Sequence, residues 1–396
     1  MESLLFSPAG ISCHSSTQTT RVILVRHART TYNERGIYQG SSDKSVLTKQ
    51  GHRDAYTTGL ALQQYDFDAI YTSPLTRVRQ TAKEIIAAAK TSDVPLYVEP
   101  KLTEVCMADW QGLSYGEVKE KYPQDYACWQ NAPHLFTRDR LNYPVLELYQ
   151  QANNFWQETL RKHRGETILI VAHGGTNRAL ISTAIALSPQ YYQSLQQCNC
   201  GISCLEFSPN SELATLRYLN NTNHLGKTLP KLKAGKTGWR WLVMSDNYVH
   251  HELGNSYLDR VLHQNGINLI LTDNNRKAQA LVNRFQKSSS SALHISTEQR
   301  NFLNIWQQTI AVKQKVANSP ATSGLFTGLI VVSEELKAQM LRQITNVEAA
   351  ADSSNCLNVI HYPHAECRAI LQGMIPLDSS QNFSIDVRDR AMRLAG

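Results

Sequence analysis

The stretch Arg21-Val-Ile-Leu-Val-Arg26-His27 is an apolar run that ends in an arginine and a histidine. A second apolar run, Thr167-Ile-Leu-Ile-Val-Ala-His173, also ends in a histidine and is followed by Gly174-Gly175. Continuous apolar runs of this length are typical of strands that are buried on both faces. Because ligands of an open α/β sheet bind at the carboxyl ends of its strands, we expect His27 and His173 to lie close together.

Two arginines suggest what this edge of the sheet would bind. Arg26 lies beside the first histidine, and Arg77 follows a third apolar run in Thr72-Ser-Pro-Leu-Thr-Arg77. A guanidinium group is permanently charged, and its planar donors match phosphate oxygens. A single histidine after an apolar run is more often structural, but two histidines with two arginines indicate a phosphate pocket. Histidine can act as a covalent nucleophile, so the pocket suggests phosphoryl transfer.

Several segments, in this order, resemble the histidine phosphatase superfamily, in its phosphoglycerate mutase-like branch. The resemblance covers about residues 20–230, and many matching blocks in one order are far more specific than one arginine-histidine pair. The matching segments are Val25-Arg-His-Ala-Arg-Thr-Thr-Tyr-Asn33, Tyr38-Gln-Gly40, Leu47-Thr48 with Gly51, Thr72–Ala82, Leu102-Thr-Glu104, Trp110-Gln-Gly112, Val171–Arg178 and Leu219–Leu225.

The resemblance implies a role for each matching residue. His27 would attack phosphorus and carry a phosphohistidine, while Arg26, Arg77 and His173 would surround the transferred group and stabilise its oxygens. Glu104 would protonate the leaving oxygen and then activate water, which requires a position where burial or phosphate keeps a proton on its carboxyl. The phosphate or its substrate would also contact a further set of groups: Asn33, the backbone around Gln39 and Gly40, and Gly174. Neither a metal nor another cofactor is expected.

The sequence departs from the family pattern at two neighbouring positions. Ala28 stands where the family has glycine after the catalytic histidine, which adds a methyl group where the backbone passes the phosphate. Arg29 stands where glutamate is common and makes the local charge more positive. We expect Arg29 to be either an anion contact for the substrate or an ordinary surface residue.

The composition limits the classes of partner. The formal net charge of +7 is spread along 396 residues, without a lysine- or arginine-rich run, so we expect no nucleic-acid partner. No apolar run approaches the ~20 residues of a membrane-spanning helix. The eight cysteines form no paired zinc motif, and reduced thiols in the cytoplasm are the default expectation. The expected partner is a small phosphorylated metabolite, and a homodimer is compatible with the sequence.

The alternation of apolar runs and helical patterns in the first half predicts a three-layer α/β/α sandwich with a mostly parallel sheet. Expected strands cover 21–26, 68–72, 96–98, 167–172 and 202–207. Expected helices cover 48–64, 76–90, 114–121, 145–163 and 175–186. The domain prediction is a disordered tail at 1–20, a catalytic domain at 21–226, a linker at 227–238, a non-catalytic α/β domain at 239–378 and a tail at 379–396.

Segments of the second half resemble those of the first in the same order. Arg240–Asp246 matches Arg21–His27, Asn268–Lys277 matches Asp68–Arg77, Asn304–Ile310 matches Asn154–Leu160, Leu329–Ser333 matches Leu169–His173 and Leu357–Ile360 matches Ile202–Leu205. We therefore expect a smaller, degenerate copy of the first unit, in which Ser245, Asp246 and Ser333 stand where Arg26, His27 and His173 stand. The alternative is two unrelated halves whose buried strands look alike. Ser288–Ser291 and Lys313–Gly324 are expected to be loops or disordered.

A phosphohistidine enzyme can pass its phosphoryl group to water or return it to a substrate. Mutases of the family have a longer insertion between the glutamate and the second histidine than Leu113–Gly165 provides, which favours a phosphatase. Arg138 and Arg140 in this stretch would recognise a second anion or belong to a solvated loop. The resemblance implies sugar phosphates, phosphoserine and sugar-acid phosphates as substrates. 2-Carboxy-D-arabinitol 1-phosphate is included because the two-part appearance also resembles phosphatases named for it. A phosphoglycerate mutase and a regulatory sensor of a phosphorylated metabolite remain the alternatives.

Overall fold

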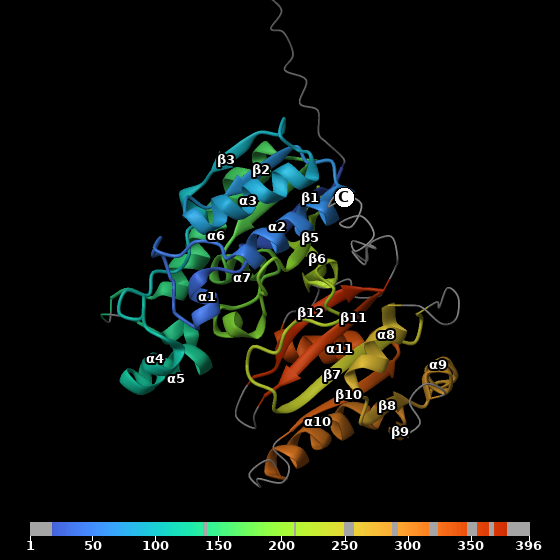
Figure 1. The fold of residues 1–396 in the computed structure, drawn as a ribbon. Helices are drawn as coiled ribbons and strands as arrows, with labels where there is room; N and C mark the ends of the chain where they lie inside the picture. Colours follow the sequence, from blue (N-terminus) through green and yellow to red (C-terminus); the bar gives the residue numbers. More distant parts are fainter. Residues whose placement is uncertain are drawn as a thin grey trace, which may run out of the picture.

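A computed structural model describes residues 18–377, except for 138, 140, 210, 249–256, 287–291, 317–323, 347–354 and 364–367. In this part of the chain one twelve-stranded sheet extends through the molecule in the order β3-β2-β4-β1-β5-β6-β12-β11-β7-β10-β8-β9. The first unit (residues 18–226) supplies β1–β6 and is blue to green in Figure 1, and the second unit (residues 238–377) supplies β7–β12 and is yellow to red.

The first unit contains a parallel group of strands extended by an antiparallel pair. Strands β3, β2, β4 and β1 are parallel neighbours, whereas β5 and β6 are antiparallel to β1 and to each other. The bounds are β1 Thr20–Arg26, β2 Ala69–Thr72, β3 Leu96–Val98, β4 Thr167–Ala172, β5 Ile202–Phe207 and β6 Ala214–Asn221.

Helices cover both faces of this sheet. Ile23 and Val25 of β1 share a core cluster with residues of α2 and α3, whereas Val22 and Leu24 share another with residues of α6 and α7. Alternate side chains of a strand point to opposite faces, so these two clusters define the expected three layers. The helices are α1 Thr31–Arg35, α2 Lys49–Leu62, α3 Thr76–Ala89, α4 Tyr115–Lys121, α5 Pro123–Asn131, α6 Pro144–Lys162 and α7 Gly174–Ala184, with 3-10 turns η1 Pro100–Leu102, η2 Pro133–Leu135, η3 Pro189–Ser194 and η4 Asn223–Leu225.

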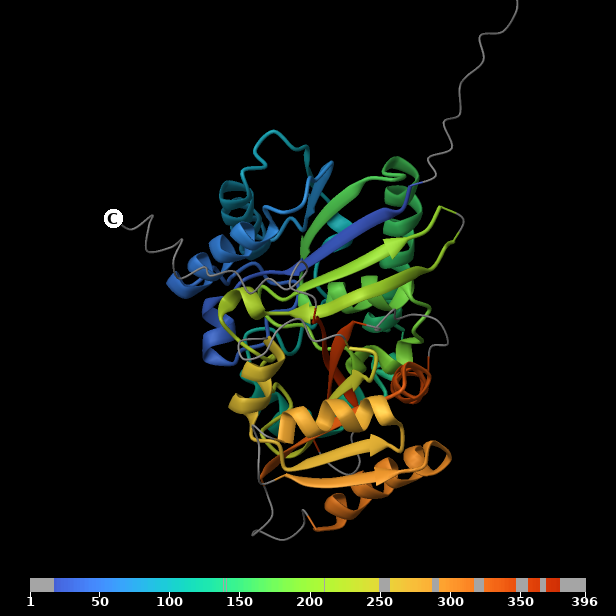
Figure 2. The same cartoon turned by 90° about the vertical axis from the view of Figure 1, so that its right-hand side faces the viewer.

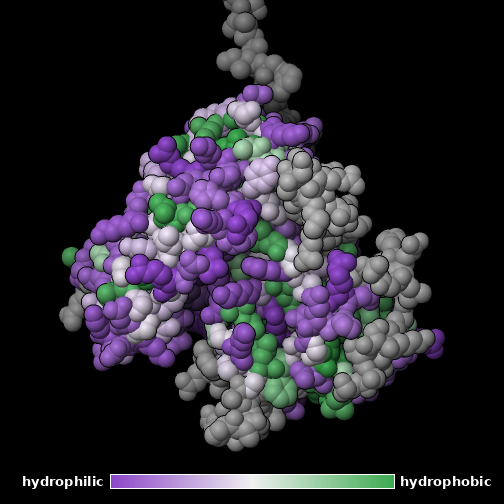
Figure 3. All heavy atoms as spheres, in the orientation of Figure 1, coloured by the Kyte–Doolittle hydropathy of each residue, from purple (hydrophilic) through white to green (hydrophobic). Residues whose placement is uncertain are grey.

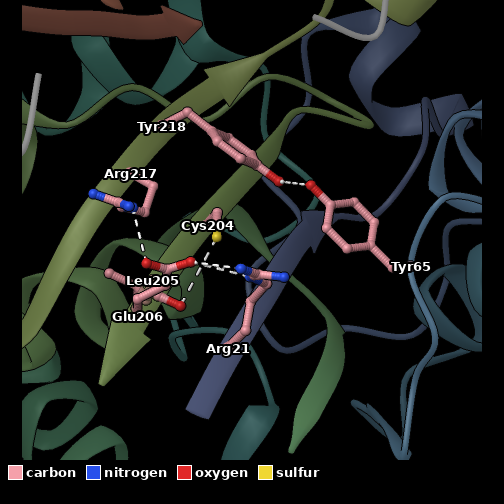
Figure 4. A network of polar contacts seen from close by, with 7 residues as sticks. All are labelled: Arg21, Tyr65, Cys204, Leu205, Glu206, Arg217 and Tyr218. Carbon is pink, nitrogen blue, oxygen red and sulfur yellow. Dashed lines mark hydrogen bonds and ion pairs between the residues drawn. The ribbon is translucent and has the colours of Figure 1, made fainter. Parts of the chain in front are cut away.

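Polar side chains connect β1, β5 and β6, the three strands of the first unit that lie nearest the second unit (Figure 4). Glu206 of β5 accepts from Arg21 of β1 at 2.9 Å and forms an ion pair with Arg217 of β6 at 2.9 Å. The hydroxyl groups of Tyr65 and Tyr218 lie 2.9 Å apart. These residues explain why β6 was absent from the sequence prediction: polar side chains interrupt its apolar pattern, and their partners are distant in the sequence.

The second unit has the same strand order as the first. Its strands follow the order β9-β8-β10-β7-β11-β12, with the first four parallel and β11 and β12 antiparallel. Their bounds are β7 Gly238–Ser245, β8 Leu269–Asp273, β9 Leu293–Thr297, β10 Leu325–Val332, β11 Cys356–Tyr362 and β12 Ile370–Pro376. The helices are α8 Tyr257–Asn265, α9 Arg276–Gln286, α10 Gln299–Val316 and α11 Glu334–Thr345.

Strand register fixes which residues correspond in the two units. The amide of His27 donates to the Ala172 carbonyl at 2.8 Å, and the amide of Asp246 donates to the Val332 carbonyl, also at 2.8 Å. Val22 pairs with Ile168 in the first unit, and Trp241 pairs with Gly328 at the corresponding place in the second. Where the first unit pairs two medium-sized side chains, the second unit therefore pairs the large side chain of tryptophan with a glycine.

The two units meet through the strands that correspond to each other. Leu219 of β6 pairs antiparallel with Met374 of β12, and the Asn220 amide donates to the Gln372 carbonyl at 2.6 Å. One hydrophobic cluster includes residues of both units, among them Leu219, Leu371 and Met374. The second unit therefore continues the sheet and the hydrophobic core of the first. Figure 2 shows the two units from the side.

Some expected boundaries differ from the structure. The expected linker ends one residue too late, because Gly238 is the first residue of β7. The first residues of the expected loop Lys313–Gly324 belong to α10, which continues to Val316. The expected strands and helices of the first unit are confirmed, while α1 and α5 were not foreseen. Residues 1–17, the loop at 288–291 and the C-terminal tail lie outside the described residues.

The pair of Trp241 and Gly328 allows a test of packing in the second unit. A Cβ atom on Gly328 would lie 2.1 Å from Cζ3 of Trp241, whose side chain is fully buried. We expect Gly328→Ala to lower the free energy of unfolding by about 1–3 kcal/mol, because the buried ring has no room to move. Urea unfolding would measure this loss, with Gly324→Ala as the control, since a Cβ there meets nothing within 4 Å. Equal stability of the two variants would contradict this packing.

The face of the molecule in Figure 3 is covered mainly by hydrophilic side chains, with hydrophobic ones in small groups. Among the described residues, no helix is both long and apolar enough to cross a bilayer. Cys198, Cys200 and Cys204 are buried. None of the six described cysteines forms a disulfide with another.

Candidate active site

The carboxyl ends of three parallel strands bring distant residues together. His27 follows β1, Ser73 follows β2 and His173 follows β4. The rings of His27 and His173 lie edge to face with their centroids 5.4 Å apart, so the expected meeting of the two histidines occurs. Both residues are buried, with His27 2 % exposed and His173 fully covered.

The ring of His27 is oriented by its own backbone. Its Nδ1 lies 2.8 Å from the Ala28 carbonyl oxygen, and a carbonyl can only accept, so Nδ1 carries the hydrogen. The other nitrogen, Nε2, is then left with its lone pair when the ring is neutral. Burial lowers the pKa of His27 well below its usual value of 6.5, and the nearby Arg26 and Arg77 lower it further. A neutral ring with an available Nε2 is the form that a nucleophile requires.

The two arginines are held by backbone carbonyls and retain unused donors. Arg26 Nη1 donates to the Gln197 carbonyl at 2.9 Å, and Arg77 donates through Nη1 and Nη2 to Ser42 and Gly40, both at 2.7 Å. The Nε groups of Arg26 and Arg77 are buried without a hydrogen-bond partner. Burial lowers the pKa of Arg77 to about 10. An anion between the two arginines would satisfy these donors and offset the cost of burying their charges.

His173 adds a further unused group to the same place. Its Nε2 lies 2.8 Å from the Ser73 hydroxyl, while its Nδ1 is buried without a partner. Burial lowers the pKa of His173 well below 6.5, with contributions from Arg77, His27 and Arg26. The four side chains are therefore close enough to influence one another electrostatically, and the nearby Glu104 carboxylate acts on both arginines.

Glu104 follows η1, and its side chain contacts the first turn of α7, the helix that begins directly after His173. Its carboxylate accepts from the amides of Gly175 at 3.0 Å and Thr176 at 3.1 Å, and from that of Val105 at 3.0 Å. The N-terminus of a helix favours negative charge, which explains this position. A Cβ on Gly175 would lie only 2.3 Å from Glu104 Oε1, so glycine is needed for the approach. Glu104 is thus fixed beside the histidine pair.

The methyl group of Ala28 does not face the phosphate pocket. Ala28 is fully buried and belongs to a small cluster with Leu47, Ala55 and Cys200. Its amide donates to the Thr81 hydroxyl at 3.0 Å. Alanine in place of the family's glycine is therefore accommodated by packing behind the loop.

Arg29 is mostly exposed and forms an ion pair with Glu34 at 3.4 Å. Its carbonyl accepts from the Thr48 amide at 3.0 Å, which fixes the start of α2. These contacts agree with the surface alternative for Arg29, and the substrate contact stays a prediction.

The other expected contact residues have protein partners in this structure. The Asn33 side-chain oxygen accepts from Thr30 and Asn199, and the Gln39 oxygen accepts from the hydroxyl groups of Thr30 and Ser45. Gly40 positions Arg77 through its carbonyl, and a Cβ on Gly174 would lie 3.2 Å from Arg26 Nε. Their direct contact with substrate stays a prediction. Arg138 and Arg140 lie outside the described residues.

Sequence reasoning missed residues that position the catalytic set. Asn199 donates to the carbonyls of His27 at 2.9 Å and Ala28 at 3.2 Å, and so fixes the loop after β1. Ser73 orients His173, as described above. Asn199 precedes β5 and is distant in sequence from His27, so its role could not be seen without the fold. Ser73 was visible only as part of the matching Thr72–Ala82 segment.

The corresponding edge of the second unit carries different chemistry. By register, Asp246 takes the place of His27, Asp273 that of Ser73 and Ser333 that of His173. Asp246 and Asp273 both accept from the Asn275 amide, and the Ser333 amide donates to Asp273 at 3.1 Å. Two carboxylates here would repel a phosphate. Among the described residues, no group of three or more His, Cys, Asp and Glu side chains could hold a metal ion.

Comparison with known proteins places the first unit in a family. The model of the histidine phosphatase superfamily (branch 1) matches residues 22–222, about half of the chain. The protein therefore belongs to the histidine phosphatase superfamily. The match ends close to the end of the first unit, and the site described above lies entirely inside it.

Named relatives include several phosphatases. The chain is 37% identical over 262 residues to a protein of Arabidopsis thaliana named probable 2-carboxy-D-arabinitol-1-phosphatase, covering 66% of this chain and 53% of that one. It is 43% identical over 192 residues to the 2-carboxy-D-arabinitol-1-phosphatase of Triticum aestivum, covering 48% and 38%. It is 29% identical over 207 residues to phosphoserine phosphatase 1 of Hydrogenobacter thermophilus, covering 52% and 95%.

The coverage of these relatives is uneven. The chain spans about half the length of the Arabidopsis protein and less of the wheat protein. The Arabidopsis match is longer than the family domain, so it extends into the second half of this chain. A solved structure of Bacillus stearothermophilus YhfR is 26% identical, with a TM-score of 0.48, and covers 52% of this chain and 99% of that one.

The lowered pKa of His27 predicts its protonation state in solution. We expect His27 to remain neutral, with hydrogen on Nδ1, from pH 8 down to well below 6.5, because burial and two arginines disfavour a third positive charge. Nitrogen-15 spectra of histidine-labelled protein would report this state, with the His27 signals assigned from a His27→Ala sample. The unfolded protein in urea is the control, since its histidines titrate near about 6.5. A native His27 that protonates at or above pH 6.5 would contradict the account.

Proposed function

We propose that the protein is a phosphatase that hydrolyses a small phosphorylated metabolite through a phosphohistidine on His27. The observation that carries this proposal is the pair of unpaired, buried Nε–H donors of Arg26 and Arg77, with the unpaired Nδ1 of His173 beside them, around a neutral His27. An isolated set of this kind is costly to bury, and a phosphoryl group is the ligand that pairs with it.

The residues can perform the reaction in two steps. In the first, His27 Nε2 attacks phosphorus, the P–O bond to the metabolite breaks, and Glu104 gives its proton to the leaving oxygen. In the second, water attacks the phosphohistidine while Glu104 takes a proton from it, and the P–N bond breaks to release phosphate. Arg26, Arg77 and His173 would stabilise the charge on the phosphoryl oxygens in both steps. The proposed chemistry uses no metal.

The named relatives support a substrate class of small phosphate esters. Two of them are named for a sugar-acid phosphate and one for phosphoserine. We include 2-carboxy-D-arabinitol 1-phosphate, other sugar phosphates and phosphoserine in the proposed range.

The test is phosphate release from a panel of these compounds and phosphoglycerates, with and without EDTA. Release that persists in EDTA supports the proposal. Release that requires an added divalent metal would contradict its metal-independent part. Conversion of 3-phosphoglycerate to 2-phosphoglycerate without release would favour the mutase alternative, since proteins named as phosphoglycerate mutases also match, one at 30% identity over 202 residues. Binding without turnover would favour a sensor.

We further propose that the second unit is a degenerate copy that has lost the chemistry. Its strand order and directions match those of the first unit, which supports a repeat over two unrelated halves. Residues 99–143 separate β3 from α6 and contain Glu104, whereas only Glu298 separates β9 from α10. The second unit thus has no counterpart, between β9 and α10, of the segment that contains Glu104. Because β12 occupies the edge of β6, a homodimer would have to use another surface.

A further inference from the structure

The segment that joins the two units, residues 227–237, is attached to the first unit beside the active site. Pro230 is buried, and its carbonyl accepts from Arg240 Nη2 at 2.6 Å. The Lys231 carbonyl accepts from the Gln196 side chain at 2.9 Å. The backbone amide of Gln196 in turn donates to the Leu371 carbonyl of β12 at 3.0 Å. The connecting segment is therefore anchored by both units rather than hanging between them.

This attachment brings Lys233 to the arginine that faces the phosphate pocket. The Lys233 ammonium donates to the Gln197 carbonyl oxygen, the same oxygen that accepts from Arg26 Nη1 at 2.9 Å. Two cations thus share one neutral acceptor. Lys233 also contributes to the lowered pKa of His27, after burial, Arg26, Arg77 and the opposing Ala28 hydrogen bond. Its ammonium is therefore close enough for His27 to be affected by its charge.

Lys233 lies among like charges. Among the described residues, no carboxylate forms an ion pair with Lys233. Burial, together with Arg26, Arg178 and Lys231, lowers the pKa of the Lys233 ammonium well below its usual value, so a nearby anion would favour the charged form. Lys233 is exposed as a whole residue, although the surroundings of its ammonium are buried. An ammonium with one bond to a carbonyl retains two donors and one charge, which suits a carboxylate.

We propose that Lys233 determines specificity by binding a carboxylate of the substrate whose phosphate lies against His27. This inference rests on the proposed phosphatase function. Lys233 lies outside residues 22–222 of the family domain, so the recognition belongs to the segment that the second unit adds. The second unit then has a function at the active site: with the connecting segment fixed between the units, it holds the ammonium in place.

The test compares two substrates that differ only in the carboxylate. 3-Phosphoglycerate carries a carboxylate where glycerol 3-phosphate carries a hydroxymethyl group. We expect the wild type to prefer 3-phosphoglycerate in kcat/KM. Lys233→Met retains the length of the side chain without its charge, and we expect it to raise KM for 3-phosphoglycerate on the order of tenfold or more, with little change in kcat. The loss with glycerol 3-phosphate should be several-fold smaller, because this compound has no carboxylate to bind the ammonium, and Lys233→Arg should restore most of the preference.

Lys236→Met is the matched control, because Lys236 is exposed on the same connecting segment. An equal loss on both substrates would show a structural or general electrostatic role and overturn the proposal, as would an unchanged preference.

If the wild type hydrolyses both compounds equally, this inference fails and the proposed function stands. If it hydrolyses neither, the proposed function fails for this pair, and calorimetric binding of the two compounds decides the inference. A carboxylate preference in Kd that Lys233→Met removes supports it, and equal Kd values overturn it.

Discussion

Replacing His27 with alanine is expected to reduce phosphate release on the order of 10⁴-fold or more, the largest effect of any single substitution. The reason is that His27 supplies the atom that bonds to phosphorus, and no neighbour can take its place: His173 lies with its ring centroid 5.4 Å away and has its Nε2 against Ser73. The measurement is kcat for the best substrate of the panel, together with the unfolding midpoint to show that the variant is folded.

His52→Ala is the matched control for this substitution. His52 lies on α2 and pairs with Glu84 at 2.9 Å, away from the strand ends that form the site. We expect the control to keep its activity. A His27→Ala variant that is folded and retains a tenth or more of the wild-type rate would rule out His27 as the nucleophile.

The second large effect is expected for Glu104→Gln. An amide has no proton to give to a leaving oxygen and cannot take one from water, so hydrolysis of an alkyl phosphate should fall on the order of 10²- to 10⁴-fold. p-Nitrophenyl phosphate separates the two steps, because its leaving group departs without protonation. For this compound we expect Glu104→Gln to release one nitrophenolate per protein in a rapid burst. Slow turnover should follow, because hydrolysis of the phosphohistidine lacks the base that activates water.

Glu99→Gln provides the control on the same segment. Glu99 accepts from the Lys101 amide at 2.9 Å and pairs with its ammonium at 3.6 Å, so the substitution tests the local structure without the proposed acid. Near wild-type turnover is expected. Loss of the burst in Glu104→Gln together with normal binding would contradict the proposed role, because it would show that the first step needs Glu104 for something other than protonating the leaving oxygen.

The parts of the fold that are built from buried, periodic segments could be predicted from the sequence. Strands β1 and β4 are continuous apolar runs with His27 and His173 at their ends, so their type and neighbourhood could be predicted. Strand β6 was missed because its stability depends on contacts with Glu206, Tyr65 and β12, which are distant in sequence. The joining of both units into one sheet could not be predicted, since it depends on edge strands whose pairing leaves no local pattern.

The placement of the proposed catalytic residues could be predicted for a similar reason. Strand ends determine where His27 and His173 lie, Arg26 and Arg77 follow from apolar runs of the same kind, and the resemblance supplied Glu104. The supporting residues could not be predicted. Gln197 accepts from Arg26 through its backbone carbonyl, which any residue type would offer, and Asn199 donates its side-chain amide to the His27 carbonyl, which is distant in sequence. Lys233 was read as part of a basic linker, and only the structure shows that its ammonium reaches the site.

The arrangement of the units gives the chain the organisation of a dimer made from one polypeptide. Corresponding strands β6 and β12 pair in the middle of the sheet, and the order of strands on one side repeats in reverse on the other. In such an arrangement one unit can lose its chemistry while the other retains it. Asp246 and Ser333 in the second unit agree with that loss, and Lys233 shows how the fused unit could still affect the active one.

The measurement that tests the central claim most directly is a trap for the phosphoenzyme. The protein is mixed with p-nitrophenyl phosphate, quenched in alkali to preserve a P–N bond, digested and examined by mass spectrometry. We predict one phosphoryl group on His27, more abundant in Glu104→Gln than in the wild type and absent in His27→Ala. A phosphoryl group on another residue, or turnover without any phosphoenzyme in Glu104→Gln, would contradict the account.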